Sequence, residues 1–359
     1  MADEFEHFTG TKPVHPQHAF DVGALSAWAR DQRIPGFDQA VTVEQFKGGQ
    51  SNPTFRISAG GQRYVLRRKP PGNLLPSAHA VDREFRVISA LHGTDVPVAK
   101  PWALCEDTAV IGAMFYLMDC VDGRVLWDPA LPGMTPDQRA AHYDELGRVM
   151  AALHSVDVQA VGLDGFGKPG QYVARQVERW TKQYRAAETE PIAAMDRLIE
   201  WLPARIPAGD ETRVVHGDYR FDNVIFHPSE ARILAVLDWE LSTLGHPLVD
   251  FAYHCMTWHM ATGEGNRGLL GVDLAALGIP DEAAYLARYL ERTGRAPGSI
   301  SAADWNYYLV FNMFRLAGIL QGILARALQG NASNERALQA GKRARPLAEQ
   351  AWALAQSLG

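Results

Sequence analysis

The 359-residue sequence has only three cysteines, and their arrangement excludes two kinds of site. Cys105, Cys120 and Cys255 are odd in number and far apart, and none forms a Cys-x-x-Cys pair. Because disulfide frameworks and zinc sites need paired or closely spaced cysteines, we expect neither. Reduced thiols, buried or half-buried, are typical of the cytoplasm, which is the predicted location.

The sequence also lacks a basic excess and an uninterrupted apolar run long enough to cross a membrane. Its net charge is −6 with a pI near 6.1, so no general attraction to nucleic acid or anionic lipid is expected. The acidic start, Met1 to His7, has no apolar segment of the signal-peptide type. Leu309 to Leu328 is interrupted by Arg and Gln residues and is predicted to be a core helix. We therefore predict no nucleic-acid or membrane partner, and the oligomeric state stays open.

What the sequence does contain is typical of a globular protein with two parts. Hydrophobic residues make up 47% and charged residues 21%, and the length suffices for two sub-domains with separate cores. Strand-like runs dominate before Met118 and helical patterns dominate after Gly123. The short segment between them predicts a linker. The expected domains are residues 1–118, a hinge at 119–124, and residues 125–359.

Local signals predict the elements of both parts. Asp21 is a helix cap, Gly60-Gly61 is a tight hairpin turn, and Thr135-Pro136-Asp137-Gln138 has the order of an N-cap, an N1 proline and a capping box. Alternation predicts strands and a 3.6-residue period predicts helices. The expected strands are 40–46, 54–59, 63–68, 102–105 and 113–118, and the expected helices are 21–32, 77–91, 135–154, 171–187, 192–202, 281–292, 302–329 and 333–358.

One stretch, residues 214–240, concentrates polar groups at the ends of predicted strands. Asp218 follows an apolar pair, Asn223 comes five positions later, and Asp238 ends a second strand after a turn. A hairpin would bring the three side chains together. Phosphoryl transfer needs one carboxylate facing the attacking hydroxyl, and an amide and a second carboxylate on Mg²⁺. Any one of these residues alone would fit an ordinary polar turn, so the hypothesis depends on their joint identity and order.

The same stretch resembles a known family. His216 and Asp218, then four residues and Asn223, match the protein-kinase catalytic loop, but Gly217 replaces its Arg and Asp-Trp-Glu replaces Asp-Phe-Gly. The run is similar to the aminoglycoside phosphotransferase and choline kinase-like family over residues 41–327. The resemblance implies an α+β, bilobal protein-kinase-like fold: a small N-terminal lobe with an antiparallel sheet and one helix, and a larger, mainly helical C-terminal lobe. It also implies ATP as co-substrate, Mg²⁺ and a small-molecule acceptor.

The resemblance implies roles for residues around the catalytic loop. Asp218 would accept the proton of the acceptor, with His216 and Arg220 beside it, while Asn223 and Asp238 would bind Mg²⁺. Asp250, in Gly-x-Pro-x-x-Asp at 245–250, and Glu240 would support the loop from behind. The interval from Asp238 to Asp250 is too short for a protein-kinase activation loop, which argues against a protein substrate.

Two segments of the N-terminal part are predicted to contact the nucleotide. Gly48, Gly49, Ser51 and Asn52 occupy the place of the loop that covers the phosphates, although two adjacent glycines fit any hairpin. In the family, the linker backbone hydrogen-bonds the adenine, which predicts that role for the segment from Asp119 to Val121.

A basic triplet occupies the position of the kinase lysine that pairs with the phosphates. Arg67, Arg68 and Lys69 are the candidates, and strand alternation favours Arg67. Glu84, within the following helix, is the expected partner of this cation, with Asp82 as an alternative. Pairing of Glu84 with a neighbour on its own helix is nearly as plausible.

The acceptor is the least determined part of the prediction. Aminoglycosides are polycations, and the C-terminal helices show no Asp and Glu cluster for them, whereas Arg220 and several other arginines favour an anionic acceptor. The motif variant looks most like kinase-like domains beside or fused to acyl-CoA dehydrogenases, which suggests a hydroxyacyl-CoA or hydroxy acid. The alternatives are an aminoglycoside, amino-alcohol or sugar kinase, and a catalytically silent nucleotide-binding module. Candidate pocket residues, which fit core positions equally well, are His254, Trp258, Tyr307 and Arg315.

Overall fold

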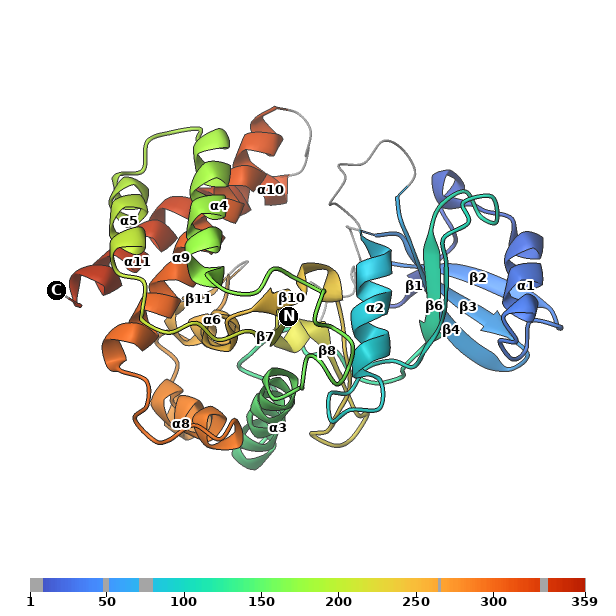
Figure 1. Ribbon diagram of the computed structural model, residues 1–359, viewed down its shortest axis with the longest axis horizontal. Helices are drawn as coiled ribbons and strands as arrows, with labels where there is room; N and C mark the ends of the chain where they lie inside the picture. The colour runs from blue at the N-terminus through green and yellow to red at the C-terminus, as the bar shows by residue number, and fades with distance from the viewer. Residues whose placement is uncertain (1–8, 48–51, 71–79, 264–265, 330–334, 359) are drawn as a thin grey trace. The chain divides into compact units, whose positions relative to one another are not determined.

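The computed structural model describes residues 9–47, 52–70, 80–263, 266–329 and 335–358 (Figure 1). The chain divides into two compact units. We call them the sheet unit (Met1–Trp127, Gln159–Leu163 and Phe221–Ser242) and the helical unit (Asp128–Val158, Asp164–Arg220 and Thr243–Gly359). The sequence predicted residues 125–359 as one helical lobe. Residues 221–242 instead belong with the sheet, because their hairpin bonds to its linker.

The sheet unit is built on six strands in the order β1-β2-β3-β4-β6-β5, and all neighbouring strands are antiparallel (Figure 1). Gly60 and Gly61, with φ of +55° and +77°, form the predicted turn between β3 and β4, where both positions favour glycine. The strands are β1 Thr11–Lys12, β2 Val41–Phe46, β3 Thr54–Ala59, β4 Gln62–Arg68, β5 Pro101–Cys105 and β6 Phe115–Asp119.

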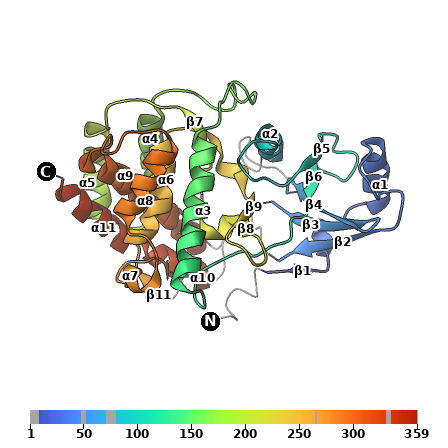
Figure 2. The same cartoon turned by 90° about the horizontal axis from the view of Figure 1, so that it is seen from below.

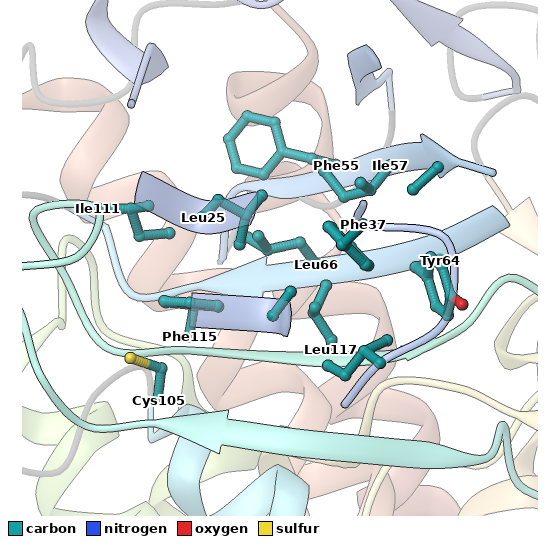
Figure 3. Packing of buried hydrophobic residues seen from close by; sticks show 13 residues of the cluster. Leu25, Phe37, Phe55, Ile57, Tyr64, Leu66, Cys105, Ile111, Phe115 and Leu117 are labelled. Atoms are coloured by element: carbon teal, nitrogen blue, oxygen red, sulfur yellow. The ribbon is translucent and has the colours of Figure 1, made fainter. Parts of the chain in front are cut away.

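Strand alternation gives the two faces of this sheet different helices. Leu66, Phe115 and Leu117 point into an apolar core with Leu25 of α1 (Val22–Asp31), as Figure 3 shows. Arg67 and Tyr116 point to the opposite face, where their side chains meet Glu84 of α2 (Val81–Leu91). The predicted start of α2 at Ser77 lies outside the described residues.

The hairpin of β8 (Val224–Phe226) and β9 (Ile233–Val236) completes the sheet unit. Arg124 and Phe226 exchange two backbone hydrogen bonds of 2.8 Å, and Val236 N–H donates to Pro97 O at 2.9 Å. These bonds attach the hairpin to the linker after β6 and to the segment before β5. Short 3₁₀ turns flank it, η2 at Phe221–Asn223 and η3 at Trp239–Leu241.

The helical unit packs around the buried helix α9, Ala302–Leu328, which contacts α4, α6 and α11 (Figure 2). This helix is long and apolar enough to cross a membrane, but 67% of its most apolar window is buried, as in a core helix. The predicted capping box of Thr135 and Gln138 opens α3. The other elements are α3 Pro136–His154, α4 Tyr172–Ala186, α5 Ala193–Ala204, β7 Arg213–Val215, β10 Thr243–Gly245, α6 Pro247–Cys255, η4 Met256–His259, β11 Thr262–Gly263, β12 Asn266–Arg267, α7 Leu274–Leu277, α8 Glu282–Arg292, α10 Glu335–Lys342 and α11 Ala344–Gln356, with η1 Pro16–His18 in the sheet unit.

The C-terminal helix predicted over 333–358 is two helices, so that prediction was wrong in part. The chain breaks at Arg343, and α11 begins at Ala344. Pro346 explains the break, because proline has no N–H and its ring clashes with the carbonyl four residues earlier in a continuous helix.

Candidate active site

Asn223 and Asp238 lie at the same end of the β8–β9 hairpin. Val224 pairs with Val236, and the next pair is closed by Leu237 N–H donating to Asn223 O at 2.8 Å. Asp238 follows with φ of +61°, a left-handed conformation that aspartate tolerates better than most residues. The hairpin register therefore places Asn223 opposite Leu237, the residue before Asp238, so both polar residues lie at the same end of the hairpin.

This donor pair fits Mg²⁺. Magnesium takes oxygen ligands and is usually held by one or two protein groups together with substrate phosphates and water, not by a cage of side chains. In the described ranges, no group of three His, Cys, Asp or Glu residues is arranged to hold a metal ion. The Asp238 side chain is 36% exposed, which leaves it accessible to a shared ion. Asn223 and Asp238 would supply the protein's oxygen ligands.

Arg67 connects Asp238 to Glu84 inside the sheet unit. Its Nε lies 3.1 Å from Glu84 Oε2, and its Nη2 lies 3.2 Å from Asp238 Oδ1. Glu84 is buried and accepts two further hydrogen bonds, from Asn52 Nδ2 at 2.9 Å and from the Tyr116 hydroxyl at 3.1 Å. Asn52, Glu84 and Arg67 thus belong to one hydrogen-bond network. Tyr116 is a further member, which the sequence analysis did not predict.

Burial and charge act in opposite directions in this network. Burial raises the pKa of Glu84 to about 7, although Arg67 opposes the shift. Burial alone would lower the pKa of Arg67, but Glu84, Tyr116 and Asp238 outweigh it, so the pKa of Arg67 is raised. Arg67 therefore stays positively charged beside Asp238, which is what a cation that neutralises phosphate charge requires.

The Glu84 shift predicts a pH-dependent stability. Since its pKa is about 7 in the folded protein against an ordinary value of 4.5, the folded state holds the proton more tightly. Its contribution is fully present below pH 4.5 and is lost as pH rises through 7. We expect wild type to lose up to about 3 kcal/mol of unfolding free energy relative to Glu84→Gln over that interval.

Urea unfolding of wild type and Glu84→Gln from pH 4.5 to 8 measures how the unfolding free energy of each protein changes with pH. Asp82→Asn is the matched control, because Asp82 lies on the same helix but is 42% exposed and pairs with Lys69 at 3.5 Å. Parallel stability curves for wild type and Glu84→Gln would contradict the raised pKa of Glu84.

The other two cations of the basic triplet face elsewhere. Arg68 is buried on the α1 side, where it lies over the rings of Phe20 and Phe55 and donates to the carbonyls of His18 and Ile111. Lys69 pairs with Asp82. Arg67 is thus the member of the triplet that meets Glu84 and Asp238, as strand alternation predicted.

The remaining nucleotide candidates are only partly described. Gly48, Gly49 and Ser51 lie outside the described residues. In the linker, Asp119 N–H donates to Lys100 O at 2.9 Å and Cys120 N–H donates to Arg63 O at 3.1 Å. Asp119 could therefore offer a base only its carbonyl group, while Val121 could offer its N–H. Glu240 lies in η3, where its charge helps to raise the pKa of Arg67.

In the helical unit, Asp250 hydrogen-bonds to the backbone of the catalytic loop. Its Oδ2 accepts His216 N–H at 2.7 Å, and its Oδ1 accepts Gly217 N–H at 2.8 Å. Gly217 has φ of +86°, so a residue with a Cβ would be strained there. This conformation explains why glycine replaces the usual arginine, and Asp250 supports the loop through the backbone N–H groups of His216 and Gly217.

Asp250 is itself held by a buried histidine that the sequence analysis did not identify. His154 of α3 places Nε2 at 3.2 Å from Asp250 Oδ2, and its Nδ1 lies 2.7 Å from the Tyr289 hydroxyl. Burial would raise the pKa of Asp250, but its contacts with His154 and His216 outweigh burial and lower it. Asp250 is therefore a buried anion held in place by several donors. No local spacing signal links α3 to this loop.

Asp218 has a partner on each carboxylate oxygen. The Tyr253 hydroxyl donates to Oδ1 at 2.6 Å, while Arg220 places Nη2 at 3.2 Å from Oδ2 and Nε at 3.2 Å from Oδ1. Its own N–H donates to the His216 ring at 3.2 Å. His216 is buried, so its ring serves the shape of the loop rather than contact with solvent. Asp218 itself is 21% exposed, as a group that meets a substrate must be.

Three of the four candidate acceptor residues are packed into the interior of the helical unit. His254 Nε2 lies 3.0 Å from the Tyr285 hydroxyl, Trp258 donates to Pro280 O at 2.9 Å, and Tyr307 donates to Leu202 O at 3.0 Å. Burial lowers the pKa of His254 to about 4, so it is neutral. His254, Trp258 and Tyr307 thus occupy core positions, which was the alternative to an acceptor pocket. The proposed reaction does not use these three side chains.

Comparison with known proteins agrees with this geometry. The sequence profile of the phosphotransferase enzyme family matches residues 42–303. A solved structure from Ralstonia eutropha JMP134, described as a putative aminoglycoside phosphotransferase, is 59% identical, with a TM-score of 0.87 over 94% of this chain and 99% of that chain. Choline kinase from Cryptosporidium parvum Iowa II is 12% identical, with a TM-score of 0.62 over 92% and 96% of the two chains, and shows a shared fold.

A curated relative places a similar sequence inside a longer protein. Acyl-CoA dehydrogenase family member 10 of Mus musculus is 46% identical over 350 residues, which cover 97% of this chain. The chain spans 32% of the length of that relative.

Proposed function

The chain belongs to the phosphotransferase enzyme family, and on that premise we propose that it transfers the γ-phosphoryl group of ATP to a hydroxyl group of a small anionic acceptor. The observation that carries the proposal is the end of the β8–β9 hairpin. There Asp238 lies beside Arg67, and the hairpin register aligns Asn223 with Leu237. A carboxylate, an amide and a retained cation are the groups that a magnesium-bound triphosphate needs.

Each residue has a defined task in the proposed reaction. The bond from phosphorus to the acceptor oxygen forms, the bond to the ADP oxygen breaks, and the acceptor proton passes to Asp218. Asn223 and Asp238 would hold Mg²⁺, which neutralises phosphate charge when bound, and Arg67 adds a second positive charge. Because the transition state is loose, the residues act by positioning and electrostatics.

The nucleotide would be positioned by backbone as well as by side chains. We assign the carbonyl of Asp119 and the N–H of Val121 to the adenine, and the loop with Gly48, Gly49 and Ser51 to the phosphates. Asn52, at the end of that loop, hydrogen-bonds to Glu84, which in turn pairs with Arg67. The three free cysteines suit a reducing cytoplasm.

The charge around Asp218 supports an anionic acceptor, such as a hydroxy acid or a hydroxyacyl-CoA. Arg220 is 42% exposed and contacts the Asp218 carboxylate, so its guanidinium group is available to a substrate anion. Arg315 donates to Gly217 O at 2.8 Å and adds a second positive charge to the loop. A polycationic aminoglycoside would meet the exposed Arg220 unfavourably.

An acceptor screen tests this proposal directly. We expect ATP consumption with hydroxy acids or hydroxyacyl-CoA thioesters to exceed that with aminoglycosides or amino alcohols by about 10-fold or more, which is the effect of one charge-assisted hydrogen bond. Arg220→Gln should reduce this preference. An aminoglycoside or amino alcohol as the fastest acceptor would reject the anionic class and favour the alternative kinase.

A further inference from the structure

Tyr253 reaches the proposed general base from a different element of the helical unit. It lies on α6, is buried, and donates to Asp218 Oδ1 at 2.6 Å. Burial, helped by the negative charge of Asp218, raises the pKa of the Tyr253 hydroxyl well above its ordinary value. The hydroxyl therefore stays protonated and acts as a hydrogen-bond donor to the carboxylate.

Arg315 of α9 holds the ring of Tyr253 in place. Its guanidinium carbon lies 5.0 Å from the centroid of the Tyr253 ring and 5.5 Å from that of Trp180 on α4. Its Nη2 donates to Gly217 O, the carbonyl directly before Asp218. Because Arg315 is buried, this cation–π contact is of the stronger, desolvated kind. One side chain thus ties Tyr253 to the backbone that carries Asp218.

The two oxygens of Asp218 therefore have unequal partners. Oδ1 accepts the hydroxyl of the buried Tyr253 and also lies 3.2 Å from Arg220 Nε, whereas Oδ2 is bound by Arg220 Nη2, which belongs to a side chain that is 42% exposed. The exposed Arg220 side chain is displaced more easily than the buried Tyr253 phenol. Its displacement breaks fewer packing contacts, and its guanidinium group is then hydrated by water. An acceptor hydroxyl group would therefore take the place of Arg220 on Oδ2, where the contact to be lost is the weaker one.

We propose that Tyr253, held by Arg315, is a positioning residue that fixes Oδ1 of Asp218 and thereby reserves Oδ2 for the proton of the acceptor. This inference rests on the proposed function, in which Asp218 is the base. Among the described residues, Arg220 and His216 of its own loop and Tyr253 of α6 face Asp218, and Arg315 lies behind Tyr253. Neither the sequence motif nor the family resemblance had indicated Tyr253.

Tyr253→Phe is the direct test, because it keeps the ring against Arg315 and removes only the hydroxyl. We expect Mg²⁺-dependent ATP turnover to fall about 10-fold, the usual order for a lost hydrogen bond to a charged group, with KM for ATP unchanged. A carboxylate that loses a donor binds a proton more readily, so the acid limb of the pH–rate profile should move up by about one pH unit. Purely structural loss would lower stability without moving that limb.

Tyr143→Phe is the matched control. Tyr143 is buried in the same unit and donates to Pro129 O at 2.6 Å, the same distance, so the substitution removes a hydroxyl group that bonds to a backbone carbonyl instead of a carboxylate. Arg315→Lys is a second variant, which keeps the charge but loosens the ring, and should move the acid limb in the same direction by less.

The outcomes separate this inference from the function on which it rests. Unchanged turnover in Asp218→Asn would overturn the proposed function, and the positioning role with it. Lost turnover in Asp218→Asn, with an acid limb in Tyr253→Phe and Arg315→Lys that coincides with wild type and Tyr143→Phe, would overturn the positioning role alone.

Discussion

Replacing Asp218 with Asn is expected to lower ATP turnover about 10²–10⁴-fold, the usual range of general-base assistance. Asparagine has the same size, and its carbonyl oxygen can still accept the 2.6 Å hydrogen bond from Tyr253. An amide does not take up a proton near neutral pH, so the base is lost. Binding of the magnesium–nucleotide complex should therefore be retained. Steady-state turnover and calorimetric titration with a non-hydrolysable ATP analogue measure the two quantities separately.

Asp281→Asn is the control for this substitution. Asp281 caps α8 in the same helical unit by accepting Ala284 N–H at 2.7 Å, and asparagine is an equally good N-cap. Its turnover should match wild type. Turnover retained in Asp218→Asn would remove the base from the proposed reaction. Wild-type protein that binds the nucleotide but turns over no ATP with any acceptor would instead identify a catalytically silent binding module.

Replacing Asp238 is expected to abolish the contribution of Mg²⁺ to nucleotide affinity. Asp238→Asn is preferred to alanine, because asparagine also tolerates the φ of +61° at this position. Loss of a residue that touches a metal should cost more than the 10–100-fold typical of residues behind the ligands, so we expect a fall of about 100-fold or more. Calorimetric titration with the ATP analogue, with Mg²⁺ and with a chelator, measures the effect.

The metal dependence distinguishes a lost ligand from a damaged site. Nucleotide affinity in the chelator should be similar in Asp238→Asn and wild type, whereas affinity with Mg²⁺ should differ. Asp38→Asn changes the same charge at an exposed position of the sheet unit and should behave as wild type. Equal affinities of Asp238→Asn and wild type in Mg²⁺ would exclude Asp238 from the metal site.

Features that depend on neighbours in the chain were predictable. The turn at Gly60-Gly61 and the capping box of Thr135 and Gln138 are present where the local residues indicated. The hairpin between Asn223 and Asp238 is present as the spacing predicted, and its register places Asn223 opposite Leu237, one residue before Asp238. The phosphotransferase family was confirmed, and with it the α+β class that the family implied. Both were predictable because the motif that carries the resemblance is short and contiguous.

Features that depend on distant partners were not predictable. His154 is 96 positions from Asp250, and Tyr253 is 35 positions from Asp218. The acceptor candidates His254, Trp258 and Tyr307 are buried and hydrogen-bonded inside the helical unit, which the sequence could not decide, since polar residues on an apolar helix fit a pocket or a satisfied core equally well. The position of residues 221–242 with the sheet depended likewise on hydrogen bonds to Arg124 and Pro97.

The sequence by itself determined the elements, the family and the order of Asp218, Asn223 and Asp238, because local backbone preferences and spacing encode them. The tertiary structure decided that Arg67 rather than Arg68 or Lys69 meets Glu84, that Asp250 holds the loop through backbone N–H groups, and that Tyr253 binds the base. Those side chains each have several chemically acceptable partners. Which partner is chosen depends on packing between segments that lie far apart in the chain.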